Sequence, residues 1–201
     1  TMMLSRDGYL KKMTERVLRK ATTLKYKDGD EPFIEFQSSN IHELLVFTDQ
    51  RQVYKCKVAQ FEDTKSAQLG SYLPTDLGMD PDESVTWVID PEDYKADVLF
   101  VFENGRVARV ALAGYVTKTN RKRLKNAIYG GSKLLFATVL KEDRDLALVS
   151  SDQRLINFNT SLLKTKTTNS TQGIQVFTAK NGRIVTMVGT AEEFLGGTAS
   201  V

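Results

Sequence analysis

One stretch of hairpin-like sequence recurs four times along this chain. Residues 103–110 read ENGRVARV, and similar text occurs at 5–12 (SRDGYLKK), 48–55 (TDQRQVYK) and 150–157 (SSDQRLIN). Asn-Gly and Asp-Gly are strong signals of a two-residue hairpin turn, because a type I′ turn needs positive φ at both central residues. The same turn position is occupied by Gly8, Arg51, Gly105 and Gln153, so the repeat spacings are 43, 54 and 48 residues. Spacings of this size are typical of propeller-like blades rather than of helical repeats.

Further strand-like segments predict about four strands in each unit. Apolar runs at 33–36, 85–89 and 134–139 precede the second, third and fourth hairpins, and short strand-like segments end the longer connections. The first hairpin, 2–13, has no strand before it, and the last run, 183–188, has no hairpin after it. Pairing of these two ends would close the ring and remove an exposed sheet edge.

We therefore expect one all-β, propeller-like domain over residues 1–201. Its four blades would span roughly 1–27 plus 183–188, 28–73, 74–129 and 130–182. No segment has the pattern of a long helix, and no apolar run approaches the roughly 20 residues that cross a membrane.

Charge is strongly segregated although the net charge is only +3. Residues 1–27 hold eight Lys/Arg against two acids, 28–100 hold five against sixteen, and 101–133 hold eight against one. A chain with this distribution can present a basic face to a polyanion while it stays nearly neutral overall. Charge alone leaves open the alternative that these groups are simply solvated.

The hairpins carry a cation at one repeated place. Four residues beyond each turn position stand Lys12, Lys55, Arg109 and Asn157. In a ring of blades such positions are equivalent, so the cations would form a curved basic track. The alternative is that they only protect strand edges from association.

The long connections add further cations among Ser, Thr and Asn residues, which suit phosphate oxygens. The complete set of expected DNA-binding residues is Lys11, Lys12, Arg16, Arg19, Lys20, Lys55, Arg106, Arg109, Lys118, Arg121, Lys122, Arg123, Lys125 and Lys133. Because the second connection also contains Glu62 and Asp63, we expect DNA to favour the first and third blades. The expected mode is backbone contact with bending and little sequence preference.

Signatures of catalysis and of metal binding are missing from the sequence. The single Cys56 and the single His42 leave a nucleophilic pair formally open, but two structural residues fit their strand contexts better. A lone cysteine also excludes an internal disulfide, which suits a reducing cytoplasm. Acidic clusters lie in turn contexts, where solvated carboxylates are the simpler interpretation and calcium loops the alternative. No metal or cofactor is expected.

The hairpins and their order resemble the C-terminal domain of the A subunit of bacterial type IIA topoisomerases, gyrase and topoisomerase IV. The segments that carry the resemblance are MLSRDGYLKKM (3–13), ELLVFTDQRQVYKCKV (43–58), SAQLGSYLPTDLGMDPDESVTWVI (66–89), DVLFVFENGRVARVAL (97–112) and TQGIQVFTAKNGRIVTMV (171–188). The resemblance implies a β-pinwheel, a propeller-like ring with strands exchanged between blades. Gyrase carries a basic, glycine-rich box after its first hairpin, whereas residues 17–30 here are basic without those glycines, which favours a topoisomerase IV-like chain.

The resemblance also implies a function. Such a domain binds and bends duplex DNA around its rim and presents it to the catalytic core of the same polypeptide, which works with an ATPase subunit. The chain itself would be non-catalytic, and ATP and Mg²⁺ would belong to other parts of a bacterial, cytoplasmic, nucleoid-associated enzyme. The alternatives are a propeller-like scaffold for protein interactions, which would show a large apolar patch, and a small-molecule enzyme with a polar cluster on its axis.

Overall fold

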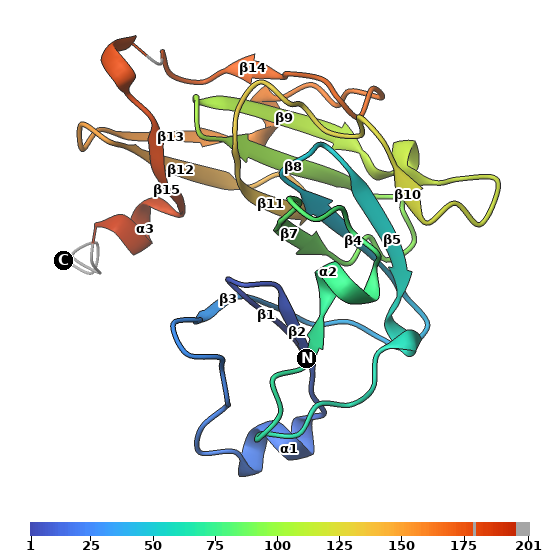
Figure 1. Cartoon of the computed structure of the whole chain (residues 1–201). Coiled ribbons are helices and arrows are strands. Elements are labelled where there is room, and N and C mark those ends of the chain that lie inside the picture. The colour runs from blue at the N-terminus through green and yellow to red at the C-terminus, as the bar shows by residue number, and fades with distance from the viewer. Residues whose placement is uncertain (179, 196–201) are drawn as a thin grey trace. The chain divides into compact units, whose positions relative to one another are not determined.

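The computed structural model describes residues 1–178 and 180–195. These residues form fifteen strands, three short α-helices and four 3₁₀ turns (Figure 1). The strands make four antiparallel sheets, which confirms the expected all-β fold and the expected number of sheets. The chain divides into two compact units, residues 1–93 with 117–127 and residues 94–116 with 128–201. That the whole chain acts as one DNA-binding domain stays a prediction.

The first unit contains two four-stranded sheets. The first sheet has the order β3 (Pro32–Phe36), β1 (Met2–Ser5), β2 (Tyr9–Lys12), β6 (Ser71–Tyr72). The second has the order β10 (Arg123–Leu124), β5 (Val53–Lys57), β4 (Glu43–Thr48), β7 (Val85–Ile89). In each sheet a hairpin forms the centre, and one strand pairs on either side of it.

The second unit repeats this plan with one difference. Its first sheet has the order β11 (Leu134–Leu140), β8 (Asp97–Phe102), β9 (Arg106–Ala111), β14 (Ile174–Gln175). Its second sheet has three strands among the described residues, in the order β13 (Leu155–Asn159), β12 (Asp145–Ser150), β15 (Val185–Gly189).

A constant pairing rule corrects the expected closure of the ring. The first strand of at least four residues after each hairpin pairs back with that hairpin: β3 with β1, β7 with β4, β11 with β8 and β15 with β12. The prediction that the last strand pairs with the first hairpin is therefore wrong. The strand β15 is the regular partner of β12, with Leu148 opposite Val188, and the first hairpin already has β3 and β6 as neighbours.

In two sheets, the short strand at one edge comes from the segment that follows the next hairpin in the sequence. Thus β6 follows β5 but pairs with β2, and β14 follows β13 but pairs with β9. A glycine with positive φ precedes each of them, Gly70 (φ 99) and Gly173 (φ 64). A Cβ at either position would collide with a backbone carbonyl of the neighbouring strand, so only glycine allows this close approach.

Helical segments are short, as the sequence predicts. The longest is α1 (Glu15–Lys20), which Thr14 caps; α2 (Leu73–Asp76) and α3 (Ala191–Phe194) are single turns. A 3₁₀ turn follows each of the last three hairpins, η1 (Val58–Gln60), η2 (Leu112–Tyr115) and η3 (Thr160–Leu162), and η4 spans Lys180–Gly182. None of the described helices is long and apolar enough to cross a membrane.

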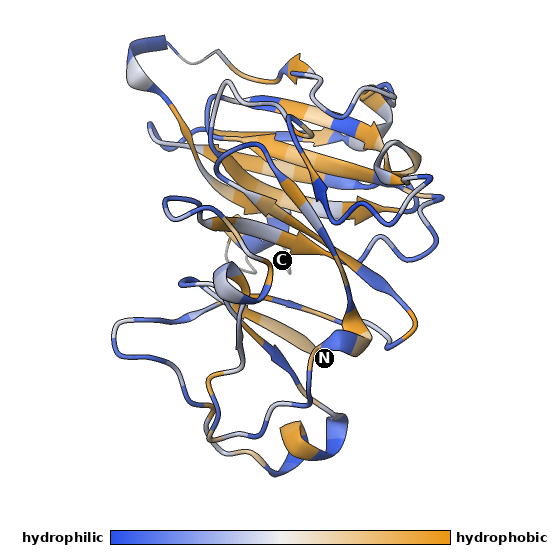
Figure 2. Cartoon of the chain, turned by 45° about the vertical axis from the view of Figure 1, so that its right-hand side comes forward, coloured by the Kyte–Doolittle hydropathy of each residue, from blue (hydrophilic) through white to orange (hydrophobic). Residues whose placement is uncertain are grey.

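Apolar residues are concentrated in the central strands, whereas the connections are mostly hydrophilic (Figure 2). In the first strand of the second and third hairpins, five consecutive residues are buried, 44–48 in β4 and 98–102 in β8. These strands have neighbours along both edges and are covered on both faces. Their sequences are therefore nearly continuous apolar runs and do not alternate between apolar and polar residues. Each unit has its own cluster of buried residues, built around Leu44 and Val46 in one and around Leu99 and Leu148 in the other.

Candidate nucleic-acid interface

The cation at the repeated hairpin position makes hydrogen bonds within the protein. The Lys12 Nζ donates to the carbonyls of Val58 (3.2 Å) and Phe61 (2.9 Å), at the 3₁₀ turn η1. The Lys55 Nζ donates to Thr117 Oγ1 (3.2 Å), just after η2, and lies 3.8 Å from a carboxylate oxygen of Glu43. In the first case the second strand of a hairpin is joined to the 3₁₀ turn after the next hairpin, and in the second case it is joined to a residue that follows such a turn in the sequence.

Arg109 makes the same connection in the second unit. Its Nη1 donates to the Thr160 carbonyl (3.1 Å) in η3, and the guanidinium pairs with Asp97 and Asp143 at 2.7 Å each. Burial opposes the charge, but the hydrogen bonds and charges of both carboxylates raise the pKa of Arg109 above its ordinary value. The structure thus gives the repeated cation a role within the protein: in three hairpins it bonds the chain at or just after the 3₁₀ turn of the next hairpin. At the fourth equivalent position, Asn157 is exposed.

Three more residues expected to bind DNA are engaged inside the protein. Lys11 is 1% exposed, and its Nζ donates to the carbonyls of Gln68 and Leu69. Burial lowers the pKa of Lys11, and the charge of Asp30 opposes this shift. Arg106 is half-buried beside the Gly173 carbonyl, 3.5 Å away, and Arg123 pairs with Asp80 at 2.6 Å. The ammonium of Lys11 therefore does not reach the surface, and Lys11 is not retained as an expected DNA contact.

The other expected residues are exposed and lie on connections. They are Arg16, Arg19, Lys20, Lys118, Arg121, Lys122, Lys125 and Lys133. On α1, Arg19 pairs with Glu15 at 2.8 Å, and since both side chains are highly exposed this pair contributes little to stability. In the described part of the chain, Arg121, Lys122 and Lys125 have no carboxylate within ion-pair distance, so their charges face solvent.

The densest group of cations surrounds a cleft in the first unit. The cleft has a volume of ≈ 390 Å³ and is lined by Lys55 and Lys57 from β5 and by Thr117, Thr119, Asn120, Arg121 and Lys122 from the connection, with Glu43 and Gln60 at its side. Hydroxyl, amide and cationic groups of this kind are the usual partners of phosphate oxygens. Sequence reasoning missed Lys57, which the antiparallel pairing of β4 and β5 brings to the cleft.

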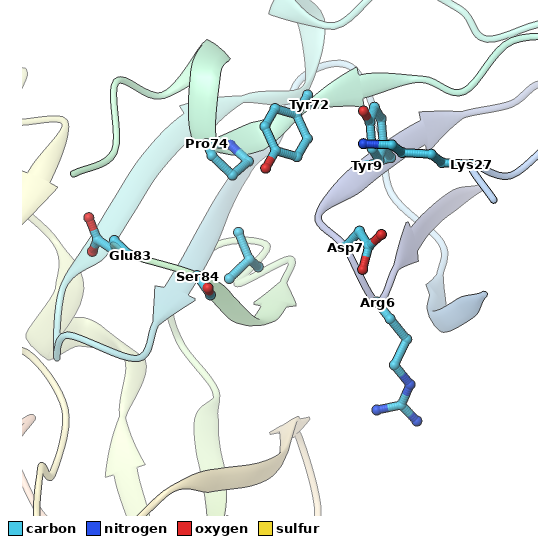
Figure 3. A pocket seen from close by; sticks show the side chains of 9 residues that line it. Arg6, Asp7, Tyr9, Lys27, Tyr72, Pro74, Glu83 and Ser84 are labelled. Atoms are coloured by element: carbon cyan, nitrogen blue, oxygen red, sulfur yellow. The ribbon is translucent and has the colours of Figure 1, made fainter. Parts of the chain in front are cut away.

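A second hollow in the same unit is less suited to an anion. Arg6 and Lys27 line it, but so do Asp7 and Glu83 (Figure 3). Tyr9 and Tyr72 face each other across adjacent strands, with ring centroids 4.8 Å apart. The mixed charges leave no net attraction for phosphate there.

The Cys56–His42 alternative finds no support. His42 Nδ1 lies 2.7 Å from Asp90 Oδ2, so its ring is bound to a carboxylate. Burial, and secondarily the charge of Glu43, raises the pKa of Cys56 to about 12. A nucleophilic cysteine needs a lowered pKa, so Cys56 is a core residue. Among residues 1–178 and 180–195, no three His, Cys, Asp or Glu side chains are grouped as metal ligands.

Comparison with curated proteins finds topoisomerase subunits. The chain is 26% identical over 125 residues to the A subunit of DNA topoisomerase 4 from Bacillus subtilis, covering 60% of this chain and 16% of that protein. It is 22% identical over 168 residues to the equivalent protein of Staphylococcus aureus, covering 81% of this chain and 21% of that protein. The chain thus spans only about a fifth of the length of these relatives. No family model matches it.

Solved structures with the same fold come from the corresponding domains. The C-terminal domain of DNA topoisomerase IV superposes with a TM-score of 0.75 at 21% identity, covering 93% of this chain and 59% of that one. The C-terminal domain of DNA gyrase A gives 0.63 at 18% identity, with coverages of 96% and 64%, and the E. coli ParC C-terminal domain gives 0.62 at 17%, with 93% and 77%. The resemblance drawn from the hairpins is therefore confirmed: the chain has the β-pinwheel fold of these C-terminal domains and is similar to the A subunit of topoisomerase IV.

Proposed function

We propose that this chain is a non-catalytic domain that binds and bends duplex DNA for the A subunit of a bacterial type IIA topoisomerase of the topoisomerase IV kind. The observation that carries the proposal is the cleft between β5 and residues 117–122, where Lys57, Arg121 and Lys122 gather with hydroxyl and amide groups. Because the chain spans a small part of its relatives, the enzyme's activity belongs to the proposal as well.

The mode of binding follows from where the cations lie. They project from connections and from the end of strand β5, and no described helix is longer than six residues. Nothing among the described residues can therefore enter a major groove as a recognition helix. Side chains of this type neutralise phosphates without reading bases. Bending of the DNA that follows two or more such connections belongs to the proposal as its means of presentation.

Exposure of the charged group supports part of the expected set of DNA contacts. The exposed cations that support the proposal are Arg16, Lys20, Lys118, Arg121, Lys122, Lys125 and Lys133, together with Lys57 of the cleft. Lys12 and Arg109 contribute charge at longer range, while their polar atoms bind carbonyls and carboxylates of the protein. The preference for the first and third connections is retained as a part of the proposal.

The partners follow from the same assignment. The domain would receive duplex DNA and pass it to the catalytic core of its own polypeptide, in an assembly with the ATPase subunit in the bacterial cytoplasm. The domain would need no cofactor of its own, and ATP and Mg²⁺ would act elsewhere in that assembly.

A salt titration tests the proposal. Gel-shift or anisotropy measurements on a short duplex and on plasmid-length DNA should show affinity that falls with salt. If four to six phosphates are neutralised, the slope of log affinity against log salt should be about −4 to −5. Two duplexes of different sequence should bind alike. Salt-independent affinity, or a strong preference for one sequence, would contradict the proposal and favour a protein-interaction scaffold.

A further inference from the structure

A network of polar side chains anchors the basic connection to the second sheet. Arg123, in β10, pairs with Asp80 at 2.6 Å through Nη2, and its Nε donates to Gln52 Oε1. Its guanidinium also lies over the ring of Tyr54, 5.4 Å from the centroid. Hydrogen bonds from Arg123 and then from Gln52 hold the pKa of Asp80 below its ordinary value. All three partners of Arg123 therefore belong to segments outside the basic connection, Asp80 to a partly exposed loop.

The network rests on a buried carboxylate. Glu83 is 5% exposed and accepts hydrogen bonds from Gln52 Nε2 (2.9 Å), Tyr54 Oη (2.6 Å), the Asp80 amide (3.1 Å) and Thr48 Oγ1. A buried charge with this many donors holds its neighbours in one arrangement. Asp80 and Gln52 are thus fixed before they meet Arg123.

The backbone alone holds the connection weakly. The strand β10 has two residues, with Arg123 opposite Tyr54 and Leu124 opposite Val53. Two further backbone bonds join the connection to the hairpin, from the Lys55 amide to the Lys122 carbonyl (2.8 Å) and from the Ala127 amide to the Arg51 carbonyl (3.0 Å). At the start of the connection, Lys55 Nζ donates to Thr117 Oγ1 (3.2 Å). At its other end, next to Arg121 and Lys122 of the cleft, the side-chain attachment is that of Arg123.

We propose that Arg123 and Asp80 form a positioning pair, which holds residues 117–122 in the arrangement that binds phosphate, and that Arg123 is not itself a phosphate ligand. This inference rests on the proposed DNA-binding function. It assigns an acidic residue, Asp80, a favourable part in binding a polyanion.

The two roles of Arg123 predict opposite effects of one substitution. Asp80→Asn removes a negative charge near the DNA and, if Arg123 were a phosphate ligand, would release it for binding, so affinity would rise. If the pair positions the connection, the same change releases residues 117–122 and affinity falls. Asp82→Asn is the matched control, because Asp82 is an exposed residue of the same loop and has no ion pair within the described residues.

The experiment measures affinity for one short duplex over a series of salt concentrations. Asp80→Asn should weaken binding about fivefold, as expected for loss of a partly exposed charge-assisted pair. The salt slope should stay unchanged, because the same phosphates are contacted in the complex. Asp82→Asn should bind as tightly as the unaltered chain or tighter. In contrast, Arg121→Gln should lower the slope by about 0.9, as for one lost phosphate contact.

A second variant and a second readout decide the matter if Asp80→Asn does not fold. Arg123→Lys keeps the charge, but an ammonium lacks the planar fork that reaches Asp80 and Gln52 together. It should also weaken binding at constant slope, and hydrogen exchange at the Lys55 amide should quicken in the free protein. A phosphate ligand would tolerate this change with neither effect.

The outcomes separate the two proposals. Weaker binding at constant slope for Asp80→Asn or Arg123→Lys, with Asp82→Asn unimpaired, supports the positioning pair. Unchanged or tighter binding by both variants overturns it and leaves the DNA-binding function standing. Failure of the unaltered chain to bind DNA overturns the proposed function, and the inference with it.

Discussion

Replacing Arg109 by Met should destabilise the second unit while it leaves DNA binding almost unchanged. Arg109 lies on β9 at the repeated cationic position, yet its side chain is only 16% exposed and holds Asp97, Asp143 and the Thr160 carbonyl. Methionine has a similar length and keeps the packing of the stem, but it offers no donor to any of the three acceptors.

The magnitude follows from these contacts. The pair with Asp97, whose side chain is 18% exposed, should contribute about 2 kcal/mol as a charge-assisted hydrogen bond. Asp143 is 45% exposed, so its pair is screened and contributes about 0.5 kcal/mol. The bond to the Thr160 carbonyl adds about 1 kcal/mol. The loss should therefore be about 3.5 kcal/mol for the unit that contains Arg109.

Denaturant unfolding followed by circular dichroism would measure this loss. Hydrogen exchange would locate it, because the amides of Lys166 and Ala111 bond across this site, to Arg109 O (2.8 Å) and Lys166 O (2.9 Å). Arg109→Lys separates charge from geometry, since lysine keeps the charge but not the fork; it should still lose about 1–2 kcal/mol. The control is Lys164→Met, an exposed residue of the same unit that is not among the proposed DNA contacts.

The reasoning is refuted if Arg109→Met unfolds like the unaltered chain but loses DNA affinity with a smaller salt slope. Arg109 would then be a DNA contact and not a structural connection. Recovery of DNA affinity by Arg109→Lys would point the same way.

Three further outcomes are expected. Changing Arg121 and Lys122 together to Gln should lower the salt slope by about two units, whereas Lys65→Gln, outside the cleft, should change it far less; equal effects would contradict a localised basic surface. Cys56 should react slowly with a thiol reagent at pH 8 in the folded chain, because burial raises its pKa to about 12 and leaves almost no thiolate. In urea it should react rapidly. Fast labelling of the folded chain would disprove its burial. Deleting residues 183–201 should speed hydrogen exchange in β12 and spare the first sheet, because β15 pairs with β12; selective loss of the first sheet would instead support closure through the termini.

Much of the fold could be predicted from local chemistry. The Asp-Gly turn at Gly8 and the Asn-Gly turn at Gly105 mark hairpins because the backbone there has positive φ, 99° and 86°. Arg51 (φ 60) and Gln153 (φ 65) also have positive φ, although neither is glycine. At these two turns the repeat was recognised from the spacing of the hairpins and not from the residue type. Turn geometry and strand alternation depend on neighbouring residues, and the sequence therefore determined the four hairpins, the all-β class and the family that they resemble.

Strand partnership and the fate of the repeated cations were decided by tertiary structure. From its local sequence, each outer strand could pair equally well with the hairpin before it or with another hairpin. The prediction for 183–188 took the first hairpin, whereas β15 pairs with β12. In the same way, Lys12, Arg109 and Arg123 have the composition of a DNA-binding surface, yet each finds oxygen acceptors on a segment tens of residues away. A cation is satisfied by whichever acceptor the fold brings near it, and that proximity is a property of packing that no local pattern encodes.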